Sequence, residues 1–151
     1  MNFDMHFMKG LDAVADAFSG TVYSDIVQAA GEGVLFVLHK GVGATGTSTL
    51  TVEACSTITA TATAAVPFIY RKSTGTDVWG DWAAVAATGF VTTAGSSQLY
   101  QVYVDAAELA EEGYKYVRLA AVESVDSPVL GGILIALVAP RYQPTVESLL
   151  D

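Results

Sequence analysis

The sequence is short of cysteine and of basic residues, and both shortages exclude classes of function. Cys55 is the single cysteine among 151 residues, so the chain can form neither an internal disulfide nor a cluster of thiolate metal ligands. Because it lies in a strand-like run, Cys55 is predicted to be a small buried apolar residue. Lys and Arg number 7 against 16 Asp and Glu, which gives a formal net charge of −9. Nucleic-acid affinity comes largely from neutralised phosphates, so this balance disfavours a nucleic-acid partner.

Long apolar runs are also lacking, although the composition as a whole is apolar. Hydrophobic residues make up 52% of the chain and charged residues 15%, with a mean hydropathy of +0.42. The longest apolar run, residues 129–139, falls short of the roughly 20 residues that a membrane-spanning helix needs. Residues 1–7 lack the basic start and the apolar segment of a secretory signal. We therefore expect no membrane partner, synthesis and retention in the cytoplasm, and an apolar surface that a partner covers.

Groups that carry catalysis are few. The two histidines, His6 and His39, lie in strand-like runs without a metal-binding spacing, so each is predicted to face solvent or to form a structural hydrogen bond. No serine sits in a sharp glycine-flanked elbow beside a histidine base. The sequence therefore predicts a protein that is not an enzyme and that holds no metal and no cofactor.

A glycine-rich stretch, Gly41-Val-Gly-Ala-Thr-Gly46, matches the spacing of dinucleotide-binding glycines. A phosphate site of that kind needs the N-terminus of a helix directly after the glycines. The residues that follow, Thr47-Ser-Thr-Leu-Thr-Val, form a poor helix and a good strand, and no lysine follows Gly46. We interpret the stretch as a hairpin loop.

Most of the chain consists of short β-prone runs separated by glycine-rich turns, which is typical of a sandwich or a barrel. Residues 56–65 alternate threonine with alanine and isoleucine, and either a strand or a solvated loop fits them. Residues 105–112 predict one helical turn, capped by Asp105, whose acidic residues form a solvated face. The strands predicted before this turn are residues 22–27, 34–40, 48–54, 66–72, 90–93 and 98–104.

Two further runs, residues 113–123 and 129–139, are predicted to pair as a hairpin. The first places Tyr114, Tyr116 and Arg118 on one face, and we expect the two tyrosines to help fix the core. Arg118 should pair with a carboxylate or open onto an interface. The second run is nearly continuously aliphatic, which predicts a strand buried on both faces.

An alternating run precedes the predicted sandwich and a proline-containing tail follows it. The alternating run, residues 2–9, either pairs with the protein's own sheet or forms an arm that joins the sheet edge of a neighbour. Residues 10–20 fit a helical turn or an extended linker. The predicted organisation is an N-terminal arm at 1–20, a β-sandwich domain at 21–140 and a C-terminal tail at 141–151.

Two tryptophans, Trp79 and Trp82, lie in a glycine-containing loop beside Asp77 and Asp81. Aromatic platforms with a polar rim are typical of sugar sites. Tryptophans in such a turn are also typical of a loop that packs onto its own sandwich. Both interpretations stay open at the level of sequence.

Four features occur in an order that is found in a known family. They are the apolar N-terminal run, the glycine turn and strand Ala30-Gly-Glu-Gly-Val-Leu-Phe-Val, the threonine-rich strand Ser48-Thr-Leu-Thr-Val-Glu-Ala, and Gly113-Tyr-Lys-Tyr-Val-Arg-Leu followed by the Gly-Gly aliphatic strand. In this order they resemble the small jelly-roll cement, or decoration, proteins that bind the outside of tailed-bacteriophage capsids. The resemblance covers most of residues 20–140, and the Tyr-Val-Arg-Leu strand is also similar to an element of galactose-binding jelly rolls.

The resemblance implies an all-β fold, a two-sheet antiparallel jelly-roll sandwich of about eight strands with an extended N-terminal arm and a short C-terminal tail. It implies a non-enzymatic virion protein on the capsid exterior that bridges neighbouring subunits of the major capsid protein, commonly as a homodimer or homotrimer. The alternative is a carbohydrate-binding module of a phage tail or a secreted protein, with Trp79 and Trp82 as its glycan platform. The residues expected at a capsid or subunit interface are Phe3, Met5, Phe7, Tyr142 and Leu149.

Overall fold

A computed structural model describes residues 4–43, 45–74 and 77–140 of the chain. The described residues form an all-β fold with one short helix, α1 (Ala106–Glu111). The strands are β1 (Met5–Val14), β2 (Thr21–Tyr23), β3 (Val27–Gln28), β4 (Gly33–Gly43), β5 (Thr47–Cys55), β6 (Thr63–Val66), β7 (Phe68–Thr74), β8 (Ala83–Val85), β9 (Phe90–Val91), β10 (Gln98–Asp105), β11 (Tyr116–Val125) and β12 (Val129–Val138).

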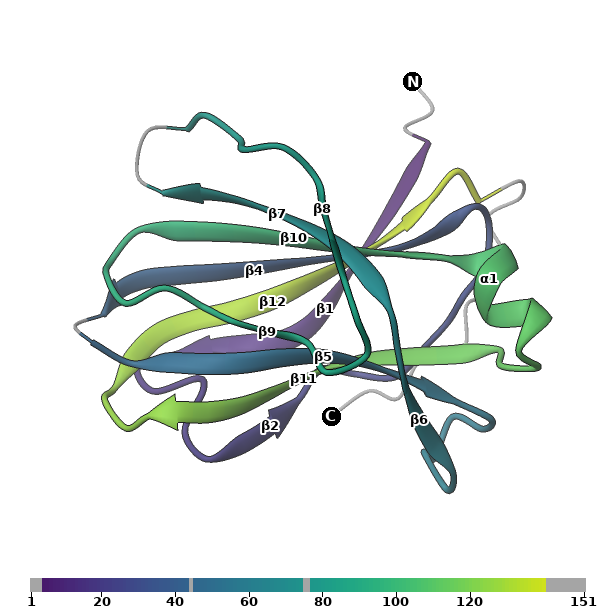
Figure 1. Cartoon of the computed structure of the whole chain (residues 1–151), viewed down its shortest axis with the longest axis horizontal. Helices are drawn as coiled ribbons and strands as arrows, with labels where there is room; N and C mark the ends of the chain where they lie inside the picture. Colours follow the sequence, from purple (N-terminus) through teal and green to yellow (C-terminus); the bar gives the residue numbers. More distant parts are fainter. Residues whose placement is uncertain (1–3, 44, 75–76, 141–151) are drawn as a thin grey trace.

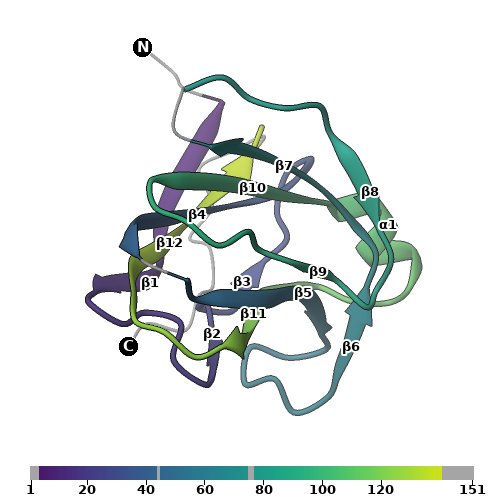
Figure 2. The same cartoon turned by 60° about the vertical axis from the view of Figure 1, so that its left-hand side comes forward.

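The strands form two antiparallel sheets that pack against each other as a sandwich (Figures 1 and 2). The first sheet has the order β1-β12-β4-β10-β7-β8. The second has the order β2-β11-β5-β6, with β3 also paired to β11 and β9 to β5. In both figures, β5 and β11 of the second sheet lie below β4 and β10 of the first. The predicted sandwich is confirmed, and its finer jelly-roll connectivity stays a prediction.

Alternation along the strands builds the core between the two sheets. On β10, the side chains of Tyr100, Val102 and Val104 are buried, whereas the residues between them are half-buried. Full burial of one valine side chain such as Val102 contributes about 1.5–3 kcal/mol to stability. The remaining large core residues with less than 2% exposure are Phe36, Leu38, Leu50, Leu119, Ile133, Ile135, Leu137, Val27, Val34, Val52 and Val117.

The two C-terminal strands do not pair with each other, so the predicted hairpin is wrong. β11 lies in the second sheet beside β2, β3 and β5, whereas β12 lies in the first sheet between β1 and β4. The connection from Asp126 to Pro128 therefore passes from one sheet to the other. Two strands that are adjacent in sequence usually pair, but here each already has neighbours on both sides in its own sheet.

The faces of these two strands also differ from the prediction. The core side of β11 carries Val117, Leu119 and Ala121, each fully buried, while Tyr116 is half-buried on the other side. Tyr116 is therefore not a core residue, although Tyr114, which precedes the strand, does pack against the core. β12 is not buried on both faces along its length, because the side chains of Leu130 and Leu134 are 43% and 52% exposed.

The N-terminal run belongs to the first sheet. β1 pairs in antiparallel register with β12, with Met5 opposite Val138 and Lys9 opposite Leu134. The predicted arm is therefore wrong for residues 5–14, which pair with the protein's own sheet. The strand continues to Val14 and is followed by a turn at residues 15–18, so residues 10–20 are neither a helix nor a linker. Phe3 and the predicted tail residues Tyr142 and Leu149 lie outside the described residues.

Most local predictions from turn and cap chemistry agree with the structure, but one does not. The Asp105 side chain accepts hydrogen bonds from the backbone N–H groups of Ala107 and Glu108, as expected of an N-cap. After Gly46 the chain forms strand β5 rather than a helix, which agrees with the argument against a nucleotide site. Because β4 and β5 belong to different sheets, the glycine-rich stretch connects the two layers and is not a hairpin loop. Residues 56–62 form a loop, and only residues 63–66 of the threonine-rich segment form a strand.

Candidate docking surface on the first sheet

The outward side of the first sheet is unusually apolar. One row of directly opposed residues crosses all six strands, and its members share an aliphatic or aromatic side chain. In order from β1 to β8 they are Phe7, Ala136, Leu35, Tyr103, Ile69 and Ala84. We call the side of the sheet that carries this row the outer apolar face.

Several large apolar side chains of this face remain in contact with solvent. Phe7 is 59% exposed, Leu134 52% and Met5 40%. The corresponding side of the second sheet is more polar, because its central strand β5 presents Thr49, Thr51 and Glu53 there. The two outward surfaces of the sandwich therefore differ in character, and the first sheet carries the candidate docking surface.

A shallow hollow of about 340 Å³ lies in the outer apolar face. Its lining includes Met5, predicted as an interface residue, and Trp82, predicted as part of a glycan platform. The structure therefore brings together two residues that the sequence placed in competing sites. The other residues that line the hollow are Leu35, Ile69, Arg71, Gln101, Tyr103 and Val138.

The two tryptophans pack over Arg71 of β7. The Arg71 guanidinium lies 4.9 Å from the centroid of the Trp79 ring and 4.7 Å from that of the Trp82 ring. Its Nε donates a 2.7 Å hydrogen bond to Oε1 of Gln101 on β10. This arrangement supports the interpretation of a loop that packs onto its own sandwich, and each cation–π contact contributes about 0.5–1 kcal/mol. Trp82 is nevertheless 42% exposed at the edge of the hollow.

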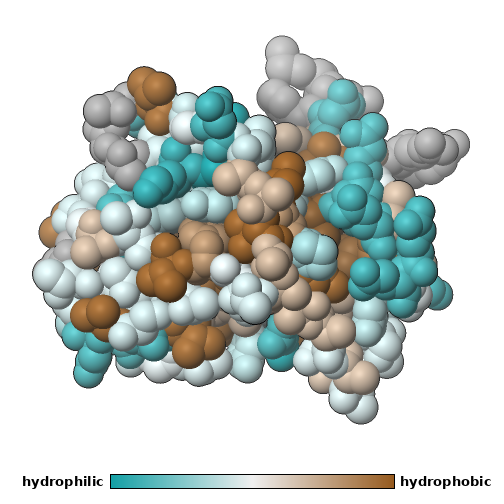
Figure 3. Space-filling model, viewed as in Figure 1, coloured by the Kyte–Doolittle hydropathy of each residue, from teal (hydrophilic) through white to brown (hydrophobic). Residues whose placement is uncertain are grey.

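Two further hollows continue from the first toward α1. The second, of about 390 Å³, shares Ile69 and Tyr103 with the first, and the third, of about 250 Å³, shares Pro67 and Val104 with the second. Exposed acidic residues of α1 border the last of them, so the predicted solvated acidic face is confirmed. Figure 3 shows hydrophilic residues over α1, next to the more hydrophobic centre of the same view.

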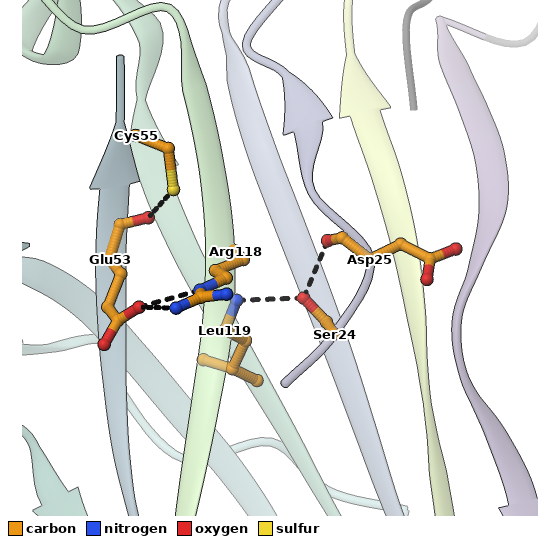
Figure 4. A network of polar contacts seen from close by, with 6 residues as sticks. All are labelled: Ser24, Asp25, Glu53, Cys55, Arg118 and Leu119. Atoms are coloured by element: carbon orange, nitrogen blue, oxygen red, sulfur yellow. Dashed lines mark hydrogen bonds and ion pairs between the residues drawn. The ribbon is translucent and has the colours of Figure 1, made fainter. Parts of the chain in front are cut away.

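Arg118 lies on the outward side of the second sheet and pairs with a carboxylate, which is one of the two outcomes expected from the sequence. Its Nε and Nη2 donate to Oε2 of Glu53 at 2.7 and 2.6 Å, and its guanidinium lies 3.8 Å from the centroid of the Tyr23 ring. Figure 4 shows this pair beside Cys55, whose Sγ donates to the Glu53 carbonyl at 3.7 Å. Cys55 is buried, as predicted, and burial raises the pKa of its thiol. These contacts join β2, β5 and β11 and hold the second sheet together.

The side chain of Ser24, also drawn in Figure 4, binds the segment that follows β2 to β11 through hydrogen bonds. The Ser24 hydroxyl accepts a 2.9 Å hydrogen bond from the Leu119 N–H and donates a 3.0 Å bond to the Asp25 carbonyl. The Asp25 N–H in turn donates to the carbonyl of Gly10 in β1. The segment after β2 thereby connects the second sheet to the first strand of the first sheet.

Neither a metal-binding group nor a membrane-spanning helix is found among the described residues. His6 and His39 are exposed, as predicted, and in residues 4–43, 45–74 and 77–140 no three His, Cys, Asp or Glu side chains form a group that could hold a metal ion. Within the same ranges, no helix is long and apolar enough to cross a membrane.

Sequence reasoning missed most of the hollow. Leu35, Ile69, Tyr103 and Val138 come from four different strands, so no single stretch of sequence contains them. One signal was present in residues 34–38, Val-Leu-Phe-Val-Leu, which are apolar at both odd and even positions and therefore predict apolar contact on both faces of a strand. No protein-family model, curated protein or solved structure matches this chain.

Proposed function

We propose that this chain is a non-enzymatic virion structural protein that binds the outer surface of a phage capsid and bridges neighbouring subunits of the major capsid protein. The outer apolar face carries the proposal, since it is the surface on which large apolar side chains gather without a cover among the described residues. The sequence resemblance to capsid decoration proteins supports the same role.

The physical requirements of that role agree with this surface. A protein that binds the assembled shell more tightly than its separated subunits stabilises the shell by mass action, and no catalytic group is needed. Burial of exposed side chains such as Phe7 and Leu134 against a capsid would release about 25 cal/mol for each Å² of apolar area removed from water. Contacts with two subunits at once would strengthen binding further through effective concentration.

Co-sedimentation with intact virions of the phage that encodes the chain tests the proposal. Leu134→Asp places a charge on the outer apolar face, on the strand next to β1, and we expect it to lower the bound fraction at least tenfold. Val122→Asp is the matched control, because Val122 is 44% exposed but lies on a strand of the second sheet. Far-UV circular dichroism of both variants checks that the fold is kept. Absence of binding by the unmodified chain, or equal loss in both variants, would contradict the proposed role.

A carbohydrate-binding module is the second candidate function, and the exposure of Trp82 favours it. The hollow that Trp82 borders also contains the polar groups of Arg71 and Gln101, a mixture that suits a sugar ring. Binding on a glycan array that disappears in both Trp79→Ala and Trp82→Ala would support this candidate. Binding that survives both substitutions would exclude the tryptophans as its platform.

A further inference from the structure

The hollow of about 340 Å³ in the outer apolar face offers hydrogen-bond donors to a ligand. Arg71 lines it, and within the described part of the chain the only hydrogen bond of the guanidinium runs from Nε to Oε1 of Gln101. Trp79 and Trp82 contact the guanidinium through their rings, and neither contact supplies an oxygen acceptor for its N–H groups. The donors on its Nη atoms therefore remain available to a ligand.

The same hydrogen bond fixes the orientation of the Gln101 side chain. Because Oε1 accepts from Arg71, the NH2 group occupies the other branch of the carboxamide, and it forms no hydrogen bond within residues 4–43, 45–74 and 77–140. Tyr103, which also lines the hollow, directs its hydroxyl proton to the backbone carbonyl of Glu32. Arg71 and Gln101 thus present N–H groups that need acceptors, and a negatively charged acceptor forms the strongest hydrogen bonds with them.

The charge in the hollow is positive, although the chain as a whole carries a formal net charge of −9. Among the described residues of the lining, Arg71 is charged and none is acidic. Asp77 and Asp81, which neighbour the tryptophans in sequence, are exposed and lie outside that lining. A guanidinium matches the two oxygens of a carboxylate in a bidentate pair. The hollow is therefore suited to a ligand that carries a carboxylate.

The rest of the lining is suited to a compact ring. Trp82 is 42% exposed at the edge of the hollow and offers an aromatic platform, and the side chains of Leu35 and Ile69 add an apolar floor. A volume of about 340 Å³ stands at the small end of the range for ligand sites, which is about 300–1,000 Å³. A single sugar ring fits this size, whereas a long alkyl chain would stay largely exposed in so shallow a hollow.

We propose that the hollow binds a hexuronic acid residue of an acidic polysaccharide. The carboxylate pairs with the Nη atoms of Arg71, sugar oxygens accept from the NH2 group of Gln101, and the face of the ring packs on Trp82. A neutral sugar would leave the guanidinium without an anionic partner. The proposal rests on the second candidate function, the carbohydrate-binding module, and names the class of its ligand. It does not depend on capsid binding.

Titration followed by tryptophan fluorescence tests the class of ligand, because the two tryptophans of the chain both contact Arg71. The probes are trimers of galacturonate, glucuronate and mannuronate, each compared with its own methyl ester, which keeps the ring and removes the charge. At least one acid should bind, and at least tenfold more tightly than its ester. Hexanoate supplies a carboxylate without a sugar ring and should bind more weakly than that acid.

The outcomes separate this proposal from the function on which it rests. An ester that binds as tightly as its acid, or hexanoate that binds as tightly as the best uronate, would overturn the acidic sugar as the ligand. In the first case the carbohydrate-binding module would stand. Absence of binding by every acid and every ester up to about 10 mM would overturn both.

Substitutions in the hollow test the residues. Gln101→Glu replaces the NH2 donor by a carboxylate oxygen that can still pair with Arg71, so the local packing is kept while an anionic ligand is repelled. It should weaken uronate binding at least tenfold, and so should Arg71→Gln. Lys72→Gln is the matched control, because it removes one positive charge from the next residue of β7, whose Nζ donates to Thr93 outside the hollow.

Isothermal titration calorimetry measures uronate binding by all three variants, and circular dichroism verifies their folds. We expect Lys72→Gln to bind as the native chain does. Native affinity in Gln101→Glu, or a loss in Lys72→Gln as large as that in Arg71→Gln, would overturn the proposal.

Discussion

Lys40 of β4 is a buried cation without a carboxylate among its hydrogen-bond acceptors, and its replacement tests how the two sheets are held together at one end of the sandwich. The side chain is 2% exposed, and its Nζ donates to the carbonyls of Gly46 and Thr93 at 2.9 and 2.8 Å. Lys40→Met keeps the length of the side chain and removes both hydrogen bonds. The carbonyl of Gly46, directly before β5, and that of Thr93, two residues after β9, then lose this donor.

The size of the effect follows from two opposing contributions. Loss of the donor to the buried Gly46 carbonyl costs about 1–3 kcal/mol, and loss of the donor to the Thr93 carbonyl, which is only partly buried, costs less. Removal of the lysine charge offsets part of this cost, because the folded state no longer has to shield an ammonium group from water. We therefore expect a net loss of about 1–2 kcal/mol in the free energy of unfolding.

Lys72→Met is the matched control. Lys72 is exposed and its Nζ donates to the hydroxyl of the same threonine, Thr93, at 3.1 Å. Replacement of an exposed side chain of this kind should change the free energy of unfolding by less than about 0.5 kcal/mol. Urea unfolding followed by tryptophan fluorescence measures both variants. A loss for Lys40→Met no larger than that for Lys72→Met would refute the reasoning.

The pH dependence gives an independent check of the same residue. Burial lowers the pKa of Lys40 below its ordinary value. In the window between the lowered pKa and the ordinary lysine pKa of about 10.4, the unfolded chain binds more protons than the folded chain at this position. The contribution of Lys40 to stability therefore rises with pH through that window, and the difference between the native chain and Lys40→Met should grow as pH increases. A constant difference would show that the lysine titrates normally.

Three further predictions concern other parts of the sandwich. Because burial raises the pKa of the Cys55 thiol, an aromatic disulfide reagent should label the native chain at least about 100-fold more slowly than the urea-unfolded chain, and equal rates would contradict its burial. A double-mutant cycle of Arg118→Met and Glu53→Gln should give a coupling of about 1–2 kcal/mol, since both side chains are largely shielded, and a value near zero would show that the ion pair is not formed in solution. Gly89→Ala should lower the free energy of unfolding by about 3 kcal/mol or more, against about 1 kcal/mol for Gly113→Ala, as measured by thermal unfolding. Both glycines have a positive φ, but of the two only Gly89 would place an added Cβ against a carbonyl of β5. Equal losses in the two variants would refute this steric argument.

Local patterns predicted local structure well. Short β-prone runs between glycine-rich turns identified β5 and β10, and each of these strands has one face in the core and one face outside. The capping role of Asp105 followed from the chemistry of its side chain and its place before a helical run. The cost of an unpaired charge within an apolar strand left two expectations for Arg118, a carboxylate partner or an interface, and the structure shows the carboxylate partner.

Which strands pair was harder to predict from the sequence, because pairing depends on residues far apart along the chain. β1 and β12 lie at opposite ends of the described chain, and an alternating run alone cannot show whether it joins its own sheet or another. Likewise, the aliphatic residues of β12 predict burial but do not say which of its two faces meets the core. The exposed Leu130 and Leu134 belong to the outer apolar face. Part of the aliphatic sequence of β12, which predicted burial on both faces, therefore belongs to the candidate docking surface.

The position of β12 between β1 and β4 also governs when the molecule can fold during its synthesis. β4 is complete at Gly43, but its neighbour β12 ends only at Val138, 95 residues later (138 − 43). At about 5–20 residues per second, a ribosome needs roughly 5–20 s to make that interval. Throughout it, β1 has no native neighbour in the first sheet, and β4 lacks both of its neighbours until β10 ends at Asp105 and one of them after that. The nascent chain must therefore keep its most apolar strands from pairing wrongly until the strand that separates them has been made.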